Sequence, residues 1–432
     1  MRFILIGLCI LFSCFVHSER LKLDVSASSA ILINGNTGSV LFEKNAHQPN
    51  FPASITKVTT ALYALEKKGG YLNVNITASE DAVGAVSSKT RMDKAFNHPS
   101  YRLEFGGSHI GIKAGEILDL RTLLYGLMLC SGNDAANVIA EYCSGSVDKF
   151  IEETNAYLRK QGIKTTTLKN PHGLHDPEHV TTAYEMGVIA SLAMRNPAFR
   201  EIVKTVRYTR PETNKQASTT FIQSNKLLKA GNCFYPKAIG VKTGYTSLAG
   251  HTLVAAAEHE GRTLIAVLLN CSDLYQRYRD AIALFEAAFA EAKITRTLFN
   301  KEYDHFSVSL KGGATPLEAS LAQDLTISYY PAEEPSFKSV LHWNNPKMPV
   351  QKNEQVGEIR LVNEQGKILK SVPLFAVREV PKTKAFRLLE ISSRVRALLF
   401  DKRTLILILM ALSSFLAYRH CKKLKTKEQE TQ

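Results

Sequence analysis

The sequence predicts an α/β (α+β) domain, in which an antiparallel sheet is flanked by helices, followed by a small all-β C-terminal domain. Between about residues 26 and 292, strand-like segments stand at both ends of a helix-rich middle. That order is expected when helices cover an antiparallel sheet. From about residue 295 to 381 the pattern changes to short alternating segments separated by turn residues. This second pattern is typical of a small β-sandwich or barrel.

The first domain begins with a predicted hairpin. Ser29–Asn34 and Ser39–Glu43 have strand composition, and the Gly-Asn-Thr-Gly sequence at 35–38 is a good hairpin turn. A helix should begin near Pro52, because proline suits the first turn and apolar residues recur at helical spacing after it. Ser54 would then lie in the first turn of that helix.

The rest of this domain contains helical patterns, then strand patterns, then one closing helix. The helices are predicted at Leu120–Leu129, Asp134–Tyr142, Val147–Gln161 and Thr182–Met194, the strands at Lys237–Lys242, His251–Glu258 and Thr263–Asn270, and the last helix at Tyr278–Ala292.

In the second domain, period-two alternation predicts five short strands. They are Phe306–Leu310, Leu325–Tyr330, Ser339–Trp343, Gly357–Asn363 and Leu369–Phe375.

The composition places this chain among folded globular proteins. Its 432 residues are 45% hydrophobic and 22% charged, which is enough apolar material for two to three domains and is unlike a disordered chain. The net charge of +14 is compatible with nucleic acid, an anionic membrane or an acidic polymer, so charge alone selects no partner. No nucleic-acid partner is predicted, because the two ends of the chain indicate export.

Residues 1–18 are predicted to be a signal peptide. Met1-Arg2 is followed by an almost wholly apolar stretch to Val16, and Val16 and Ser18 are acceptable at the minus-three and minus-one positions of a cleavage site. The alternatives are an uncleaved anchor or a lipoprotein acylated at Cys14. Phe12 disfavours the lipoprotein, because that position requires a small or β-branched residue.

The C-terminus is predicted to be a membrane anchor. A basic amphipathic stem at 382–403 leads into a continuous apolar run at 404–418, and a basic tail follows at 419–432. The run is short for a span, which needs about 20 apolar residues, so an interfacial helix is the alternative. A basic tail favours a cytoplasmic C-terminus. The upstream domains would then lie on the extracytoplasmic, periplasmic face of the cytoplasmic membrane.

Four cysteines fall in the predicted exported part: Cys130, Cys143, Cys233 and Cys271. Two disulfides or four buried thiols are both compatible with this count. Their spacing contains no CxxC pair and no neighbouring histidine ligands, so it predicts no metal site. Nothing in the sequence implies a metal or a cofactor.

A serine and a lysine at positions i and i+3 of a helix share one face, where the amine can serve as base for the hydroxyl. Ser54 and Lys57 form such a pair, and Ser146 and Lys149 form a second. One or two such pairs are expected by chance in about this length of chain, so spacing alone does not choose between them.

Two further motifs select Ser54. Ser131-Gly132-Asn133 lies between two predicted helices, and Lys242-Thr243-Gly244 lies at the end of a predicted strand. The order SxxK, SxN, KTG is that of a known group of serine acyl-transfer enzymes, and Ser146 follows Ser131 and so breaks it.

The three motifs supply complementary chemistry. Lys57 can act as base only when neutral, and burial beside the Lys242 ammonium would lower its pKa. Ser131 can relay a proton to a leaving amine, and Asn133 can hold a peptide carbonyl. Lys242 and Thr243 can bind a terminal carboxylate, while Gly244 lets an extended substrate approach the strand. The oxyanion would be held by the backbone N–H groups of Ser54 and Tyr245.

The sequence resembles the low-molecular-mass penicillin-binding proteins, the serine-type D-alanyl-D-alanine carboxypeptidases. The resemblance rests on Phe51–Lys57, Ser131–Ala136 and Gly240–Thr246, and continues at His172–Leu174, Arg277–Ala281, Val350–Asn353 and Pro373–Val377. It implies a β-lactamase/transpeptidase-like catalytic domain and no cofactor. It also implies peptidoglycan stem peptides and β-lactam antibiotics as partners.

By this resemblance Ser54 is the acylated nucleophile and Lys57 the proton acceptor. Ser131 and Asn133 take part as the second motif, Lys242 and Thr243 bind the substrate carboxylate, and Arg277 assists them. The chain departs from the family at His175, where Asp is common, and in a lengthened loop at Ser88–Phe105. His172 and His175 are interpreted as loop histidines outside the site.

Two alternatives to a carboxypeptidase stay open. A class A-like β-lactamase shares the three motifs but also uses an E-x-x-L-N loop, which the sequence does not contain. A noncatalytic penicillin-binding or wall-binding protein would not need a nucleophile and a base together.

Overall fold

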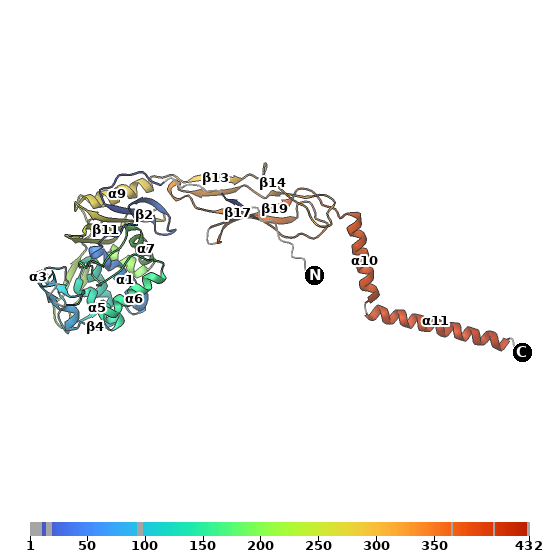
Figure 1. The fold of residues 1–432 in the computed structure, drawn as a ribbon, viewed down its shortest axis with the longest axis horizontal. Coiled ribbons are helices and arrows are strands. Elements are labelled where there is room, and N and C mark those ends of the chain that lie inside the picture. The colour runs from blue at the N-terminus through green and yellow to red at the C-terminus, as the bar shows by residue number, and fades with distance from the viewer. Residues whose placement is uncertain (1–10, 14–19, 93–97, 364–365, 401, 430–432) are drawn as a thin grey trace. The chain divides into compact units, whose positions relative to one another are not determined.

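The computed structural model describes residues 11–13, 20–92, 98–363, 366–400 and 402–429 (Figure 1). The chain forms two compact units. The larger comprises His17–Ile294 and a returning segment, Tyr329–Pro335. The smaller comprises Thr295–Ser328 and Ser336–Gln432, together with Met1–Val16.

The larger unit is built on a five-stranded antiparallel sheet, as predicted. The strand order is β10 (Ala238–Thr246), β11 (Gly250–His259), β12 (Arg262–Cys271), β2 (Ser29–Asn34) and β3 (Val40–Lys44). The predicted hairpin therefore forms, and the two ends of the domain meet in one sheet. The strand prediction at 237–242 was too short, because β10 continues through the KTG motif instead of ending at it.

Both faces of this sheet are buried, which explains why its central strands are nearly continuously apolar. Successive side chains point to opposite faces. Ile31 and Ile33 of β2 thus join the core on one face, and Ala30 and Leu32 join the core on the other. Helix α9 (Gln276–Phe289) covers the second face, and α7 (Ala183–Met194) lies against the first (Figure 1).

The helices of the larger unit follow the predicted periodicity to within a few residues at each end. They are α1 (Thr56–Lys68), α4 (Leu120–Leu129), α5 (Asn133–Ser144) and α6 (Val147–Lys160). Helix α8 (Pro197–Lys204) and the short helices α2 (Glu80–Val83) and α3 (Ser88–Met92) were not predicted. Three small strand pairs were not predicted, because two- to four-residue strands are too short to show alternation. They are β4 (Asn75–Thr77) with β7 (Ile117–Asp119), β5 (Ala85–Val86) with β6 (Leu103–Glu104), and β8 (Arg207–Arg210) with β9 (Thr219–Ile222).

The smaller unit contains an antiparallel sheet and one separate strand pair. The sheet order is β1 (Leu11–Ser13), β17 (Lys338–Trp343), β18 (Gln355–Val362), β19 (Ile368–Ala376), β15 (Leu317–Leu321) and β14 (His305–Val308), and β13 (Ile294–Phe299) pairs with β16 (Leu325–Tyr329). All five predicted strands form, and β13 and β15 were missed. β1 falls inside the segment predicted as a signal peptide, whose other residues lie outside the described ones.

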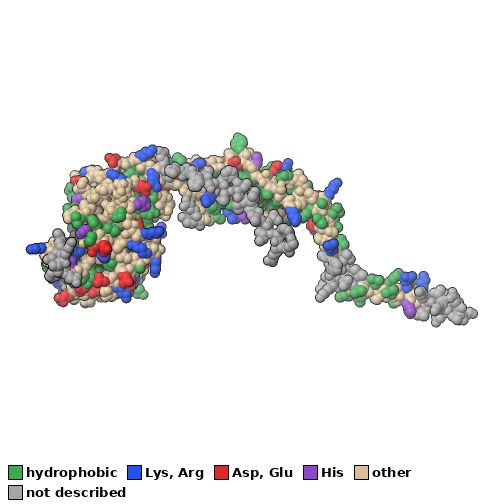
Figure 2. Space-filling model, viewed as in Figure 1, with side chains coloured by type: hydrophobic (Ala, Val, Ile, Leu, Met, Phe, Trp, Pro, Cys, Tyr) green, Lys and Arg blue, Asp and Glu red, His purple; other side chains and the backbone are tan. Residues whose placement is uncertain are grey.

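Two helices end the chain, α10 (Lys384–Phe400) and α11 (Lys402–Gln429). The predicted apolar run at 404–418 lies within α11, and its described side chains are exposed. Figure 2 shows these hydrophobic side chains along the helix, followed by basic ones. Within the described part of the chain, no helix is both long enough and apolar enough to cross a bilayer.

The four cysteines whose side chains the structure describes are free thiols. Cys130, Cys143, Cys233 and Cys271 are all unpaired with one another in the structure, which agrees with the second of the two alternatives. Cys143, Cys233 and Cys271 are buried, whereas Cys130 is half-buried.

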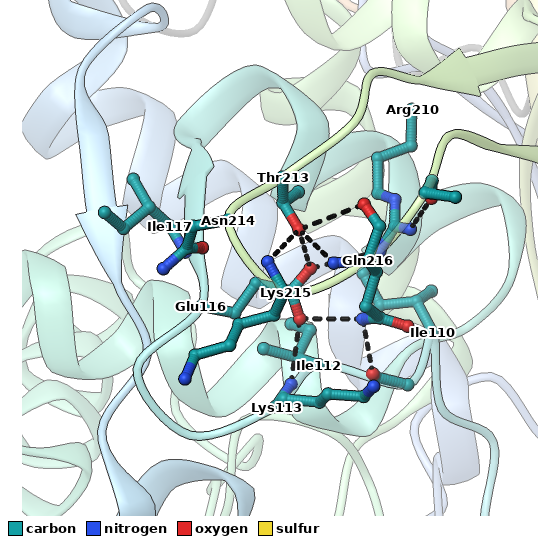
Figure 3. A network of polar contacts seen from close by, with 12 residues as sticks. Ile110, Ile112, Lys113, Glu116, Ile117, Arg210, Thr213, Asn214, Lys215 and Gln216 are labelled. Atoms are coloured by element: carbon teal, nitrogen blue, oxygen red, sulfur yellow. Dashed lines mark hydrogen bonds and ion pairs between the residues drawn. The ribbon is translucent and has the colours of Figure 1, made fainter.

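A buried ion pair fixes the hairpin β8–β9 to the loop before β7 (Figure 3). The Arg210 guanidinium lies 3.2 Å from the Glu116 carboxylate, and both side chains are almost completely buried. Thr213 Oγ1 donates to Glu116 at 2.7 Å, and Gln216 Nε2 donates to Glu116 at 2.7 Å and to the Gly111 carbonyl at 2.8 Å.

Three successive amides of the same loop, from Ile110 to Ile112, donate to the Asp134 carboxylate in the first turn of α5. The network therefore holds the start of α5 in place.

Removing the negative charge of this network should destabilise the larger unit. We expect Glu116→Gln to lower its free energy of unfolding by about 3 kcal/mol, because the buried Arg210 charge loses its partner. Pulse proteolysis of the full chain in urea measures this through the loss of the larger unit's resistant fragment. Glu258→Gln is the matched control, since its pair with Arg200 is partly exposed and should contribute less than about 1 kcal/mol. Equal losses in both variants would contradict the proposed importance of the buried pair.

Candidate active site

Ser54 lies in a tight turn directly before α1. The turn is the 3₁₀ segment Ala53–Ile55, so the serine precedes the helix instead of lying in its first turn. Ala53 has a φ of 51°, in the left-handed region that disfavours a β-carbon by roughly 1–2 kcal/mol. Gly173 packs onto this turn so closely that a β-carbon there would overlap the Ala53 carbonyl. Strain and close packing together fix the hydroxyl at the cleft.

Lys57 is completely buried one turn further along, and its amine faces three acceptors. Nζ donates to Ser54 Oγ at 3.0 Å, to Asn133 Oδ1 at 2.7 Å and to the His172 carbonyl at 2.7 Å. The SxxK pair predicted from spacing therefore is in contact. The three acceptors come from three separate segments of the chain, so the fold directs this amine at the serine hydroxyl.

The environment of Lys57 favours its neutral form. Burial, and next the nearby Lys242 ammonium, lower the pKa of Lys57 well below its ordinary value, and Asp134 opposes this only in part. Burial, and next Arg277, lower the pKa of Lys242 to about 7. Desolvation and like charges thus act in the same direction on both amines.

The second motif forms the turn between α4 and α5. Ser131 has a φ of 61°, another non-glycine residue in the left-handed region. Asn133 begins α5, and its Oδ1 accepts from Lys57. Its Nδ2 lies against Gly107, a residue of the cleft wall, where a β-carbon would come within 3.1 Å of it. The amide can therefore present a donor to the cleft while its oxygen holds the lysine.

The third motif lies within β10, at the edge of the sheet. Lys242 is buried and its Nζ donates to the Thr243 carbonyl at 2.9 Å. A β-carbon at Gly244 would lie 2.8 Å from the Ser54 amide nitrogen. Only glycine lets the strand come this near to the nucleophile's turn, which brings the backbone around Tyr245 close to the Ser54 N–H.

Arg277 is buried behind the same strand, although charged residues near a helix start are usually solvated. It donates to the carbonyls of Gly244 at 3.0 Å and Thr252 at 2.9 Å. Arg277 and Thr243 line the same cleft, and the Thr243 hydroxyl lies 3.3 Å from Ser224 Oγ.

These segments surround one cleft with a volume of about 1350 Å³. Of the predicted site residues, those in its wall are Ser54, Ser131, Asn133, Thr243, Gly244, Tyr245 and Arg277. Lys57 and Lys242 are buried beneath that wall. The second SxxK pair does not line this cleft. Ser146 instead caps the N-terminus of α6, where its Oγ accepts a hydrogen bond from the Lys149 amide.

Three contributors to the site were not predicted. The His172 carbonyl accepts from Lys57, the Asp134 carboxylate organises the loop beside the second motif, and Ser224 contacts Thr243. A backbone carbonyl has no side-chain signature, so only the resemblance at His172–Leu174 indicated that segment. Burial, and next Lys57, lower the pKa of His172 well below its ordinary value, which is consistent with leaving its ring out of acid–base roles.

The described residues contain no group of three or more His, Cys, Asp or Glu side chains placed to hold a metal ion. The cleft and the residues beneath it supply the Ser54 hydroxyl, two amines with lowered pKa values and amide donors.

Comparison with known proteins gives a consistent result. The family model described as D-alanyl-D-alanine carboxypeptidase matches residues 16–273. The D-alanyl-D-alanine carboxypeptidase DacF of Bacillus subtilis is 28% identical over 84% of this chain and 87% of its own length. DacA of Escherichia coli is 27% identical over 88% of this chain and 92% of its own.

Solved structures agree with the fold. The Francisella tularensis D-alanyl-D-alanine carboxypeptidase DacD superposes with a TM-score of 0.57 at 22% identity, covering 86% of this chain and 97% of that one. A Streptomyces DD-transpeptidase superposes with a TM-score of 0.54 at 29% identity, covering 62% of this chain and 99% of that one. With the three motifs gathered at one cleft and a family match over more than half of its length, the chain belongs to the D-alanyl-D-alanine carboxypeptidase family.

Proposed function

We propose that this protein is a serine-type D-Ala-D-Ala carboxypeptidase that removes the terminal D-alanine from peptidoglycan stem pentapeptides and is acylated by penicillin. The observation that carries the proposal is the buried Lys57 amine 3.0 Å from Ser54 Oγ. A base with a lowered pKa beside a hydroxyl is the requirement for an activated serine.

The reaction begins with attack of Ser54 Oγ on the carbonyl carbon of the penultimate D-alanine. As the new C–O bond forms, the hydroxyl proton moves to the neutral Lys57 amine. The backbone N–H groups of Ser54 and Tyr245 stabilise the oxyanion. The C–N bond then breaks, and the proton reaches the leaving amine through the Ser131 hydroxyl. Water hydrolyses the resulting ester, with Lys57 again accepting a proton, and releases the trimmed peptide.

The substrate's end is recognised by charge. Thr243 and Arg277 in the cleft wall, with the Lys242 amine buried beneath it, supply a hydroxyl and positive charge, which suits a free C-terminal carboxylate. Asn133 Nδ2 binds the peptide carbonyl on the other side of the reacting centre. The substrate lies extended along β10, where Gly244 allows the close approach.

We place this enzyme at the extracytoplasmic face of the cytoplasmic membrane. In this proposal residues 1–18 are a signal peptide, 26–292 the catalytic domain, 295–381 a β-rich domain, 382–403 a stem, 404–418 the membrane anchor and 419–432 a basic tail. The exposed apolar side chains of α11, such as Leu409 and Phe415, support membrane association of that helix.

Ser54→Ala should abolish covalent labelling by a fluorescent penicillin and D-alanine release from a stem pentapeptide, because no acyl-enzyme can form. Intact-mass measurement of the wild type after penicillin treatment should show one adduct, absent from the variant. Ser146→Ala is the matched control. It loses a helix cap worth about 1 kcal/mol but should keep both activities. Labelling that persists in Ser54→Ala would refute the assignment.

The same assay separates the two alternatives. A class A-like β-lactamase would turn over penicillin rapidly, whereas we expect the adduct to persist. A noncatalytic penicillin-binding or wall-binding protein would be labelled without releasing D-alanine.

The pH dependence of kcat/KM should follow the two buried amines. Activity should rise with pH as Lys57 loses its proton, well below pH 10.5, and fall above about pH 7 as Lys242 loses the charge that attracts the carboxylate. The profile is obtained by measuring the rate of D-alanine release from about pH 4 to about pH 10, which covers the titration of most ionisable side chains.

Lys242→Arg isolates the descending limb. A guanidinium stays charged throughout this range, so the fall above about pH 7 should disappear even if the overall rate is lower. An unchanged descending limb in Lys242→Arg would show that another group is responsible.

Removal of residues 404–432 should release the exported enzyme from the membrane fraction, because the apolar part of α11 is lost. Cell fractionation followed by penicillin labelling measures this, and a deletion of 419–432 alone is the control that keeps the apolar run. A truncated enzyme that stays with the membranes would contradict the anchor. Extraction of the full chain by alkaline carbonate would favour an interfacial helix over a span.

A further inference from the structure

The cleft has an unassigned end. If the carboxylate of the substrate lies beside Thr243 and Arg277, the rest of the peptide extends along β10 past Gly244 toward Tyr245–Leu248. These four residues line the cleft on that side. The residue that precedes the two D-alanines must therefore lie near this end, which we call the acyl end.

A second loop faces the acyl end. A small cavity shared by Thr246 with Gly173, Leu174 and His175 shows that the 173–177 loop approaches the downstream part of β10. The His175 ring packs edge-on against Phe51, with centroids 4.7 Å apart, which fixes this loop beside the turn of Ser54. Asp176, the next residue, is half-buried in the wall of the main cleft.

One carboxylate of this wall, that of Asp176, has no direct ion pair among the described residues. Arg91 and Glu104 form an ion pair at 3.2 Å and so neutralise each other, and Arg91 also donates to the Ser100 carbonyl at 2.8 Å. Asp176 accepts from Ser100 Oγ at 3.0 Å and from the Glu178 amide at 2.9 Å. Among the described residues, no lysine or arginine side chain lies within 4 Å of Asp176. Two neutral donors hold it in place, and Arg91 and Lys169 interact with it electrostatically only at longer range.

We infer that Asp176 is a specificity-determining residue that binds the side-chain ammonium of the diamino acid preceding D-Ala-D-Ala in the stem peptide. The inference rests on the proposed function. A carboxylate fixed by Ser100 and the loop amide is preorganised for a cation, and its half-buried position strengthens the attraction relative to open solvent. The site would thus favour stem peptides whose diamino acid carries a free amine over peptides in which that amine is acylated by a cross-link.

The test compares two peptides that differ only in this amine. Nα-acetyl-L-Lys-D-Ala-D-Ala keeps it, and Nα,Nε-diacetyl-L-Lys-D-Ala-D-Ala does not. We expect the wild-type full chain to show a kcat/KM for D-alanine release roughly two- to fivefold higher for the first, as for a partly exposed charge pair. In Asp176→Asn, which keeps the size of the side chain, the ratio should fall to about one.

Glu178→Gln is the matched control, because this carboxylate is two residues away, exposed, and already paired with Lys169 at 2.8 Å. Its ratio should stay at the wild-type value. A ratio is insensitive to partial misfolding, since both peptides report on the same active fraction. Meso-diaminopimelate carries a side-chain ammonium as lysine does. For a peptide containing it in place of lysine, Asp176→Asn should lower kcat/KM for D-alanine release as it does for the lysine peptide with the free amine.

Two results would overturn the inference and leave the proposed function standing. One is equal cleavage of both peptides by the wild type, and the other is a ratio unchanged in Asp176→Asn. Penicillin labelling of the wild type without cleavage of any of these peptides is a different outcome. It would overturn the proposed function, and this inference with it.

Discussion

Burial of the Lys57 amine is the constraint on which the site depends. An exposed lysine is protonated at neutral pH and cannot accept a proton from a serine. Here the side chain is completely buried and lies near a second ammonium, so its charged form is disfavoured. In the neutral form, the two N–H groups of Nζ donate to Asn133 Oδ1 and the His172 carbonyl, which leaves the lone pair for the Ser54 hydroxyl, and none of these partners is a carboxylate that would restore the charge.

The fold meets this constraint by bringing distant segments to the end of α1. The central sheet fixes β10 and the turn of Ser54 side by side, α5 presents Asn133, and the 170s loop contributes a carbonyl. Ala53 and Ser131 adopt left-handed backbone conformations in the turns that carry the two serines. Such strain persists only where the surrounding packing determines the backbone, and the buried Glu116–Arg210 pair and Gly173 are part of that packing.

The cleft is also asymmetric in charge. Arg277 in the cleft wall and Lys242 buried beneath it are positive, which suits a carboxylate. The wall also carries the Asp176 carboxylate, which among the described residues has no lysine or arginine nitrogen within 4 Å and interacts with Arg91 and Lys169 at longer range. A peptide with a free C-terminus and a basic side chain further along matches both ends. The net charge of +14 gives no hint of this arrangement, because it sums groups that the fold separates.

The sequence by itself determined the elements and the chemistry of the motifs. Period-two and helical patterns located the sheet and helices, since burial on one or both faces is recorded in apolar spacing. The motif order selected Ser54 over Ser146. Short pairs such as β8–β9 escaped prediction because they contain too few residues to show a period.

Only the tertiary structure decided what surrounds those motifs. It buried Arg277 against the Gly244 carbonyl, gave Lys57 the carbonyl of His172, and set Asp176 in the cleft wall. Backbone acceptors carry no side-chain signal, and burial of a charge depends on segments far away in the chain. A pKa is therefore a property of the folded packing, which local sequence cannot specify.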